Sequence, residues 1–181
     1  MTQQQPGRRR EYRSEYRLLG LPLIHLVVGR DPQTGAPGRA VGIIAVGRFA
    51  FGVIALGQVA VGVLPIGQLS LGLLLALGQI SVSGYEAFGQ VAVAPRLAVG
   101  QVGVGGHALA QVGVGRYVIA QAGWGAHVHS VEQPSAEALA SFRSEFPALY
   151  GLLRRVAGDA LHPVRPAEDP APARAGPEGN P

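Results

Sequence analysis

The sequence predicts an all-β protein, a β-solenoid with ten-residue coils and parallel sheets, followed by a short C-terminal helical cap. Glycine returns at every fifth position through most of residues 42–129, as in "GQVAVGVLPIGQLSLG" over residues 57–72. Glutamine returns every ten residues in the same region, or every eleven where one residue is inserted. We interpret the five-residue unit as one side of a coil and the ten-residue unit as a complete turn.

The five-residue unit does not fit an α-helix. Five residues rotate a helix by about 500°, so successive glycines would share no face. A three-residue strand followed by a glycine-containing bend fits better, because alternate residues of a strand point to opposite sides. In each unit the third and fifth residues are large and apolar, and the fourth is small. We therefore expect residues such as Ile44, Phe49 and Ile54 to fill the interior, and residues such as Ala45 and Ala50 to face solvent.

Alternate bends carry different residues, which makes ten residues the length of one coil. One class of bend carries glutamine, and amides stacked at about 4.8 Å per coil can form a ladder along one edge. The expected ladder consists of Gln58, Gln68, Gln79, Gln90, Gln101, Gln111 and Gln121. The other class is apolar where solvent is expected, and this candidate contact edge consists of Ile43, Val53, Val63 and Leu73.

A four-sided coil of twenty residues is the alternative architecture. The pentapeptide-repeat proteins have such coils, and their period is similar to this one. Their repeats usually carry Asp or Asn before a central Leu or Phe, and this chain does not. The likeness is therefore one of spacing.

The repeat is flanked by segments of different composition. The basic start of the chain predicts a disordered tail. An N-terminal cap is predicted from the short apolar run "LLGLPLIHLVVG" and the turn-rich stretch after it. The proline-rich end of the chain cannot bury a core. The expected divisions are a tail at 1–17, a cap at 18–41, the solenoid at 42–129, a helical cap at 130–157 and a second tail at 158–181.

The helical cap has recognisable start and stop signals. Ser135 is placed to be the N-cap of a helix that runs to about Phe146. Leu139, Phe142 and Phe146 then lie on one face of it. Pro147 is expected to break or restart the helix.

Composition excludes several classes of function. The chain has no cysteine, so disulfides, thiolate zinc sites and cysteine nucleophiles are ruled out. The repeat carries too few basic residues for a nucleic-acid-binding stripe. Neither a phosphate-binding loop nor a nucleophile elbow is present. We therefore expect a non-enzymatic protein with no cofactor, no specific nucleic-acid partner and no small-molecule substrate.

The apolar run before the repeat is a weak candidate for a targeting segment. Pro22 and His25 interrupt it, no small-x-small cleavage site follows promptly, and it is shorter than the ~20 residues of a membrane helix. No signal peptide is predicted. A cytoplasmic or membrane-associated location is favoured.

Histidines provide the single candidate metal site. His107, Tyr117 and His127 are ten residues apart and should stack in one column, with His129 two residues further on. A His-x-His pair with a third histidine can bind a divalent metal ion. Packing in a polar core or against the end cap is the favoured interpretation, because a ligand set normally brings carboxylates or more histidines.

The expected function is structural. A contiguous exposed apolar strip marks contact with a partner or a membrane, so we expect a scaffold that acts through self-association or membrane-surface contact. One alternative is an integral membrane protein, since 37 uncharged residues separate Arg48 from Glu86, close to the ~40 that two membrane helices need. A metal-binding protein that uses His107, His127 and His129 is the second alternative.

Residues 12–42, "YRSEYRLLGLPLIHLVVGRDPQTGAPGRAVG", resemble a group of uncharacterised bacterial glycine-rich repeat proteins. Those proteins share a Tyr-Arg-Ser start, a Gly-Leu-Pro-Leu-x-His segment, an Asp-Pro-x-Thr-Gly turn and glycine-rich pentads. The likeness continues to the exit "GAHVHSVEQPSAEALASF" and covers about 12–146. It implies a bacterial source and no particular activity. His25 and Asp31 belong to the shared segment, where capping and turn formation are their expected roles.

Overall fold

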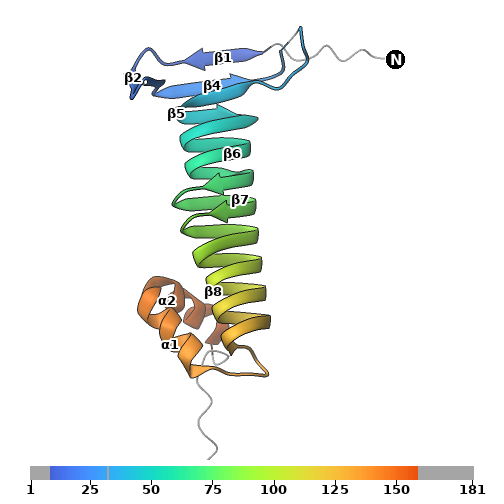
Figure 1. Cartoon of the computed structure of the whole chain (residues 1–181), viewed down its shortest axis with the longest axis vertical. Coiled ribbons are helices and arrows are strands. Elements are labelled where there is room, and N and C mark those ends of the chain that lie inside the picture. The colour runs from blue at the N-terminus through green and yellow to red at the C-terminus, as the bar shows by residue number, and fades with distance from the viewer. Residues whose placement is uncertain (1–8, 32, 159–181) are drawn as a thin grey trace, which may run out of the picture.

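The computed structural model describes residues 9–31 and 33–158 of the chain. It is a narrow column of coils, with strands across one end and two helices beside the other end (Figure 1). The elements are β1 (Arg10–Arg13), β2 (Arg17–Leu18), β3 (Leu21–Pro22), β4 (Ile24–Val28), β5 (Arg39–Gly47), β6 (Phe49–Gly72), β7 (Leu75–Ser83), β8 (Glu86–His129), α1 (Ala136–Glu145) and α2 (Pro147–Ala157).

Strands β5 to β8 wind as a parallel β-solenoid, which confirms the predicted fold class. Ile44 pairs with Ile54, a register of ten residues. The register becomes eleven between β6 and β7, where Ile66 pairs with Leu77, and again between β7 and β8, where Leu77 pairs with Phe88. Each inserted residue therefore lengthens one coil and leaves the columns aligned. The twenty-residue coil is excluded.

The alternative of transmembrane helices in the glycine-rich segment is wrong, because that segment is β-strand throughout β5 to β8. Among the described residues, no helix is long and apolar enough to cross a membrane.

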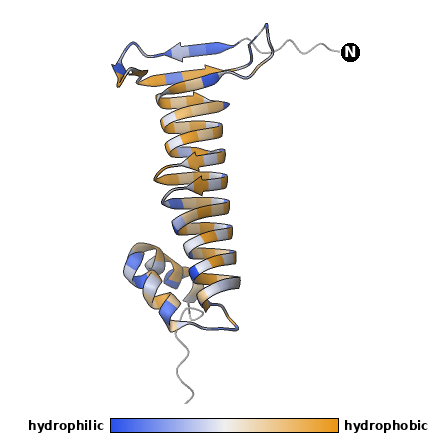
Figure 2. Cartoon of the chain, in the orientation of Figure 1, coloured by the Kyte–Doolittle hydropathy of each residue, from blue (hydrophilic) through white to orange (hydrophobic). Residues whose placement is uncertain are grey.

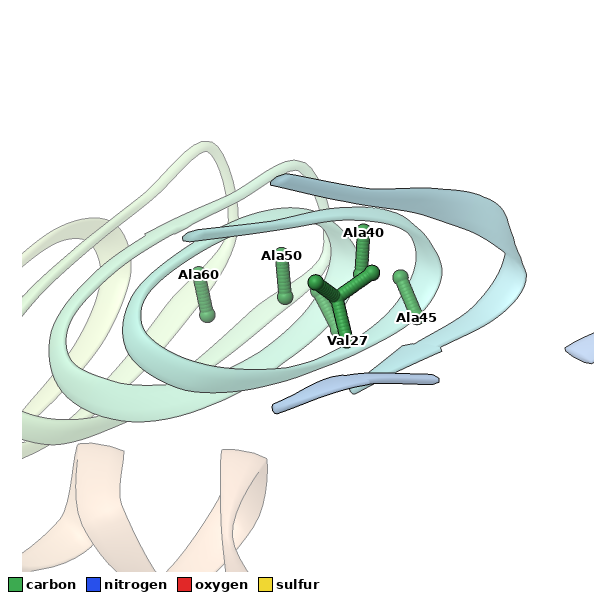
Figure 3. Close-up of a cluster of buried hydrophobic side chains, with 6 residues drawn as sticks. Val27, Ala40, Ala45, Ala50 and Ala60 are labelled. Atoms are coloured by element: carbon green, nitrogen blue, oxygen red, sulfur yellow. The ribbon is translucent and has the colours of Figure 1, made fainter. Parts of the chain in front are cut away.

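The interior of the solenoid is lined by the small residues, which reverses the expected orientation of every unit. Ala45, Ala50 and Ala55 have no exposed surface, and Figure 3 shows Ala45 and Ala50 pointing into the coil together with Val27 of β4. A coil of only ten residues brings its two walls close together, so the interior positions hold small side chains, with Pro65 and Val118 the largest that are fully buried in the described coils. Large side chains such as Ile44 and Phe49 must therefore point outward, where they are half-buried by their neighbours.

Serine replaces alanine in the interior where a donor is useful. Ser70 and Ser81 are fully buried. Ser70 Oγ donates to the carbonyl oxygen of Leu77 at 2.7 Å, and Ser81 Oγ donates to that of Phe88 at 2.9 Å. Both buried hydroxyls are thus satisfied, as buried polar groups in folded proteins normally are.

The repeated glycines permit close stacking of the coils. A Cβ atom on Gly52 would lie 2.2 Å from the carbonyl oxygen of Gly42 in the previous coil, and one on Gly57 would lie 2.1 Å from that of Gly47. Among the described glycines, positive φ angles occur outside the repeat, as at Gly35. The bends therefore need glycine because it lacks a side chain, and not because it can adopt a positive φ angle.

The N-terminal segment covers the first coil as predicted. Strand β4 stacks in parallel on β5, with Ile24 opposite Ile44, and β1 pairs antiparallel with β4. Strand β1 falls inside residues 1–17, which were expected to be a disordered tail, so the folded part begins earlier than predicted. Residues 1–8 and the predicted tail from 159 onward lie outside the described residues.

Two residues of the N-terminal segment have the roles expected of them. His25 is buried, and its Nδ1 accepts the N–H of Val41 at 2.8 Å while its Nε2 lies 3.0 Å from Glu11 Oε1. That hydrogen bond and the nearby Arg9 lower the pKa of Glu11. Asp31 forms the turn, because its Oδ1 accepts the N–H groups of residues 33 and 34.

The C-terminal helices begin and end where the sequence predicted. Ser135 is the N-cap of α1, with its Oγ accepting the N–H of Ala138, and α2 starts at Pro147. Leu139, Phe142 and Phe146 are buried. The pair lies beside β8, so the helical cap covers a flank of the last coils (Figure 1).

Candidate functional site: two apolar flanks

The outward third and fifth residues of each unit form two flat faces on opposite sides of the solenoid. Figure 2 shows hydrophobic residues along the whole stack of coils. The helix face consists of Ile44, Val46, Ile54, Leu56, Leu64, Ile66, Leu75, Leu77, Glu86, Phe88, Leu97, Val99, His107, Leu109, Tyr117 and Ile119. The open face consists of Phe49, Phe51, Val59, Val61, Leu69, Leu71, Ile80, Val82, Val91, Val93, Val102, Val104, Val112, Val114 and Trp124.

The two helices cover the C-terminal part of the helix face. Phe142 and Phe146 form a buried cluster with Leu97, and several half-buried helix-face residues, including Leu109 and Ile119, pack against it. This contact is mainly aromatic and aliphatic, with polar groups at its border. The contact therefore removes the C-terminal part of the helix face from solvent.

Arginine and histidine fix the helices on that face. The guanidinium of Arg96 lies 4.9 Å from the ring centre of Tyr85 and 4.5 Å from that of Phe146, and it pairs with Glu86. His107 Nε2 lies 2.7 Å from Ser141 Oγ. Glu86 lies in the same outward column as Leu75, its partner in the previous coil, and from there its carboxylate reaches Arg96.

The three candidate metal-ligating histidines are held apart by packing. The ring of Tyr117 stacks between His107 and His127, with centroid distances of 5.0 and 5.1 Å. His129 Nδ1 accepts the N–H of Ser135 at 3.1 Å. No group of side chains suited to a metal ion occurs within residues 9–31 and 33–158. The structure places His107 and His127 in one column with Tyr117 between them, and it does not bring the three histidines around one point.

The open face is not covered by any described part of the chain. Ile80, Val102 and Val114 are 49%, 38% and 42% exposed. None of the open-face residues belongs to the cluster around the helices. A face of this length that contains only aliphatic and aromatic side chains exceeds the scattered apolar exposure of ordinary soluble surfaces.

The glutamine row borders the open face on one side. All of the expected ladder residues are exposed. Gln68 and Gln79 are neighbours in adjacent coils, because Gly67 pairs with Gly78 and Leu69 with Ile80. At the start of the row, Arg48 Nε donates to Gln58 Oε1 at 2.6 Å. Hydrogen bonding from one glutamine to the next stays a prediction.

The predicted contact edge borders the open face on its other side. Val53 and Leu73 are 40% and 65% exposed, and Ile43 and Val63 are half-buried. The edge is thus one margin of a much larger apolar surface. Sequence reasoning missed that surface because it assigned the large residues to the interior. One feature of the sequence could have revealed this surface. In the glutamine-bearing units, no charged or amide side chain occupies the third or fifth position.

One surface cavity offers little chemistry. It has a volume of about 690 Å³ and lies at the N-terminal end, where Val28, Val46 and Leu56 line it together with Arg30 and Arg48. Its lining contains no carboxylate, histidine or hydroxyl group that could act as a general base or a nucleophile.

No family model matches the chain, and neither a curated protein nor a solved structure is similar to it.

Proposed function

We propose that this chain is a non-enzymatic scaffold protein that self-associates through its open face. The observation that carries the proposal is the outward orientation of every large apolar side chain on that face. Association would remove this surface from water at a gain of about 25 cal/mol per Å². A stable interface needs about 800 Å² from each partner, and a face that follows the solenoid over most of its length is of suitable extent.

The flatness of the face favours a second copy as the partner. Its side chains are spaced by the coil repeat along the axis, and a second solenoid has the same repeat. Two such faces can therefore interdigitate row by row, as the dry faces of stacked sheets do.

The charges around the face support a protein partner over a lipid surface. Surface-bound membrane proteins combine an apolar face with basic residues that meet anionic headgroups. Here Arg39 lies in register with Phe49 at the N-terminal end of the face. Arg96 and Arg116 instead stack on the rings of Phe146 and Tyr117 on the helix side, and Arg48 bonds to Gln58. The resemblance to bacterial repeat proteins supports a bacterial setting, in the cytoplasm or at a membrane.

A charge placed in the open face tests the proposal. Val91→Glu puts a carboxylate on the face, and Gln90→Glu puts the same charge on the bordering row. We expect the unaltered chain and Gln90→Glu to be dimers or larger by analytical ultracentrifugation. Val91→Glu should weaken association by at least about tenfold, because burial of an unpaired charge is costly. Both variants should keep the same β-type circular dichroism.

A monomeric unaltered chain would contradict the proposal. Flotation with vesicles of phosphatidylethanolamine and phosphatidylglycerol separates the two partner classes. If a monomer floats with these vesicles and Val91→Glu does not, the face meets lipid and self-association is wrong.

A further inference from the structure

Strands β2 and β3 form a hairpin at one side of the N-terminal end of the column (Figure 1). Arg17 pairs with Pro22 and Leu18 pairs with Leu21, so the two residues of the turn are leucine and glycine. The φ angles of Leu19 and of the glycine after it are +54° and +80°. A two-residue turn with positive φ at both positions strongly prefers asparagine or aspartate before the glycine. A leucine at this position therefore contradicts the chemistry of the turn.

Leu19 is the one residue other than glycine that has a positive φ angle within residues 9–31 and 33–158. A bulky side chain at such an angle is strained, because its Cβ atom crowds the following carbonyl oxygen. Packing does not offset this strain, since Leu19 is 90% exposed. Backbone strain that brings no structural benefit points to a function of the side chain itself.

The base of the hairpin is held by the strands around it. The N–H of Ser14 donates to the carbonyl oxygen of Ile24 at 2.9 Å, and the N–H of Leu23 donates to that of Tyr16 at 2.8 Å. Pro22 is buried. The turn therefore extends from a fixed base, and its side chains point into solvent.

More apolar surface adjoins Leu19 at the turn. Leu18 and Leu21 are 54% and 37% exposed, and Tyr16, just before β2, is 79% exposed. We define the hairpin tip as Leu18, Leu19 and Leu21. The tip thus presents three leucines to water, with a tyrosine ring beside them.

The charge around the hairpin tip is positive. Residues 9–23 contain four arginines and two glutamates, and Arg17 lies in β2 itself. One of the two acids, Glu11, is already paired with Arg13 and His25. An anionic partner would therefore be attracted to this part of the surface.

We infer that the hairpin tip inserts into a lipid bilayer surface that contains anionic headgroups. The leucines leave water on entering the acyl region, which is the favourable step. A tyrosine beside them suits the boundary between acyl chains and headgroups, because its ring is apolar and its hydroxyl group is polar. Arginine attracts the anionic headgroups.

The size of the hairpin tip favours a bilayer over a protein as its partner. A stable protein interface buries about 800 Å² from each partner, which a two-residue turn and its neighbours do not supply. A fluid bilayer needs no matching pocket. The inference is independent of the proposed self-association, which uses a different surface.

The substitution Leu19→Asn tests the inference by two opposite changes. We expect the unaltered chain to float with vesicles of phosphatidylethanolamine and phosphatidylglycerol. Leu19→Asn should bind them at least about tenfold more weakly, because it removes one buried leucine side chain. The same variant should unfold at a higher temperature, because asparagine accepts a positive φ angle more readily. The matched control is Leu152→Asn, which removes a leucine of α2 that is 59% exposed and should leave flotation unchanged.

The contribution of charge is measured with Arg17→Gln. This variant should bind vesicles that contain phosphatidylglycerol more weakly, and its binding to vesicles of phosphatidylcholine alone should equal that of the unaltered chain. Equal effects on both kinds of vesicle would contradict the attraction to anionic headgroups.

Three outcomes would overturn the inference. They are no flotation of the unaltered chain, equal flotation of Leu19→Asn, and flotation that is lost in Val91→Glu but kept in Leu19→Asn. The last outcome would place the lipid contact on the open face and would contradict self-association as well. A monomer that floats and loses flotation with Leu19→Asn would overturn the proposed function and leave this inference intact.

Discussion

His107 and Ser141 join the solenoid to the first helix through a hydrogen bond of 2.7 Å between Nε2 and Oγ. The residues are 34 positions apart in the chain, and the bond sits beside the buried rings of Phe142 and Phe146. The contact between the solenoid and the helices therefore includes a titratable side chain.

Acidification should loosen this docking. Burial lowers the pKa of His107, and the negative charge of Glu145 and a backbone hydrogen bond with Arg96 oppose this effect in part. A histidine whose pKa is depressed in the folded state binds more protons when unfolded, so its stabilising contribution is lost as pH falls below about 6.5. We expect faster amide hydrogen exchange in α1 at pH 5 than at pH 8, after correction for the intrinsic rate.

The matched variant for this prediction is His107→Phe, which keeps the aromatic packing and cannot be protonated. It should lose most of the pH dependence of exchange in α1. An unchanged pH dependence in this variant would assign the effect to another group.

Enlargement of an interior alanine should destabilise the solenoid severely. Ala55 has no exposed surface, and the opposite wall leaves no space for a longer side chain. Ala55→Leu should therefore cost at least about 1–3 kcal/mol of unfolding free energy. The control is Ala126→Leu, the same enlargement at an exposed position of the last coil. Urea denaturation followed by circular dichroism compares the two, and equal midpoints would contradict the observed orientation.

Two glycine-to-alanine substitutions should have opposite effects. A Cβ atom on Gly57 would lie 2.1 Å from a backbone oxygen of the previous coil, which cannot move without breaking the stack. Gly57→Ala should therefore destabilise the protein. Gly151 lies within α2 with nothing within 4 Å of its added Cβ, so Gly151→Ala should stabilise that helix by up to about 1 kcal/mol. Thermal unfolding and helix-resolved hydrogen exchange measure both effects, and a neutral Gly57→Ala would show that the coils stack less closely.

The periodicity of the sequence was sufficient to predict the coil, because five- and ten-residue spacings are properties of the backbone path. The alignment of Gln68 beside Gln79 and the N-cap of α1 at Ser135 followed from spacing and capping chemistry in the same way. These features depend on local rules that act along the chain.

The orientation of the side chains could not be predicted from the same pattern. The usual rule that large apolar residues are interior assumes enough room between the walls, and a coil of ten residues does not provide it. Once the wall separation is known, Ala45 can only be inside and Ile44 outside. The open face was missed for this reason, and so was the cover that Phe142 and Phe146 provide to the opposite face.

The methyl-lined interior also bears on how such a protein can change length over evolutionary time. In a conventional core, each side chain is fitted to several different neighbours, so a duplication or loss of one segment leaves mismatched shapes. Here the interior surface of one coil is almost the same as that of the next coil. Ala50 would therefore pack equally well against Ala40 or against Ala60. A genetic insertion or deletion of one whole repeat should therefore yield a longer or shorter solenoid without compensating mutations. The number of coils can thus change in evolution without a redesign of the interior.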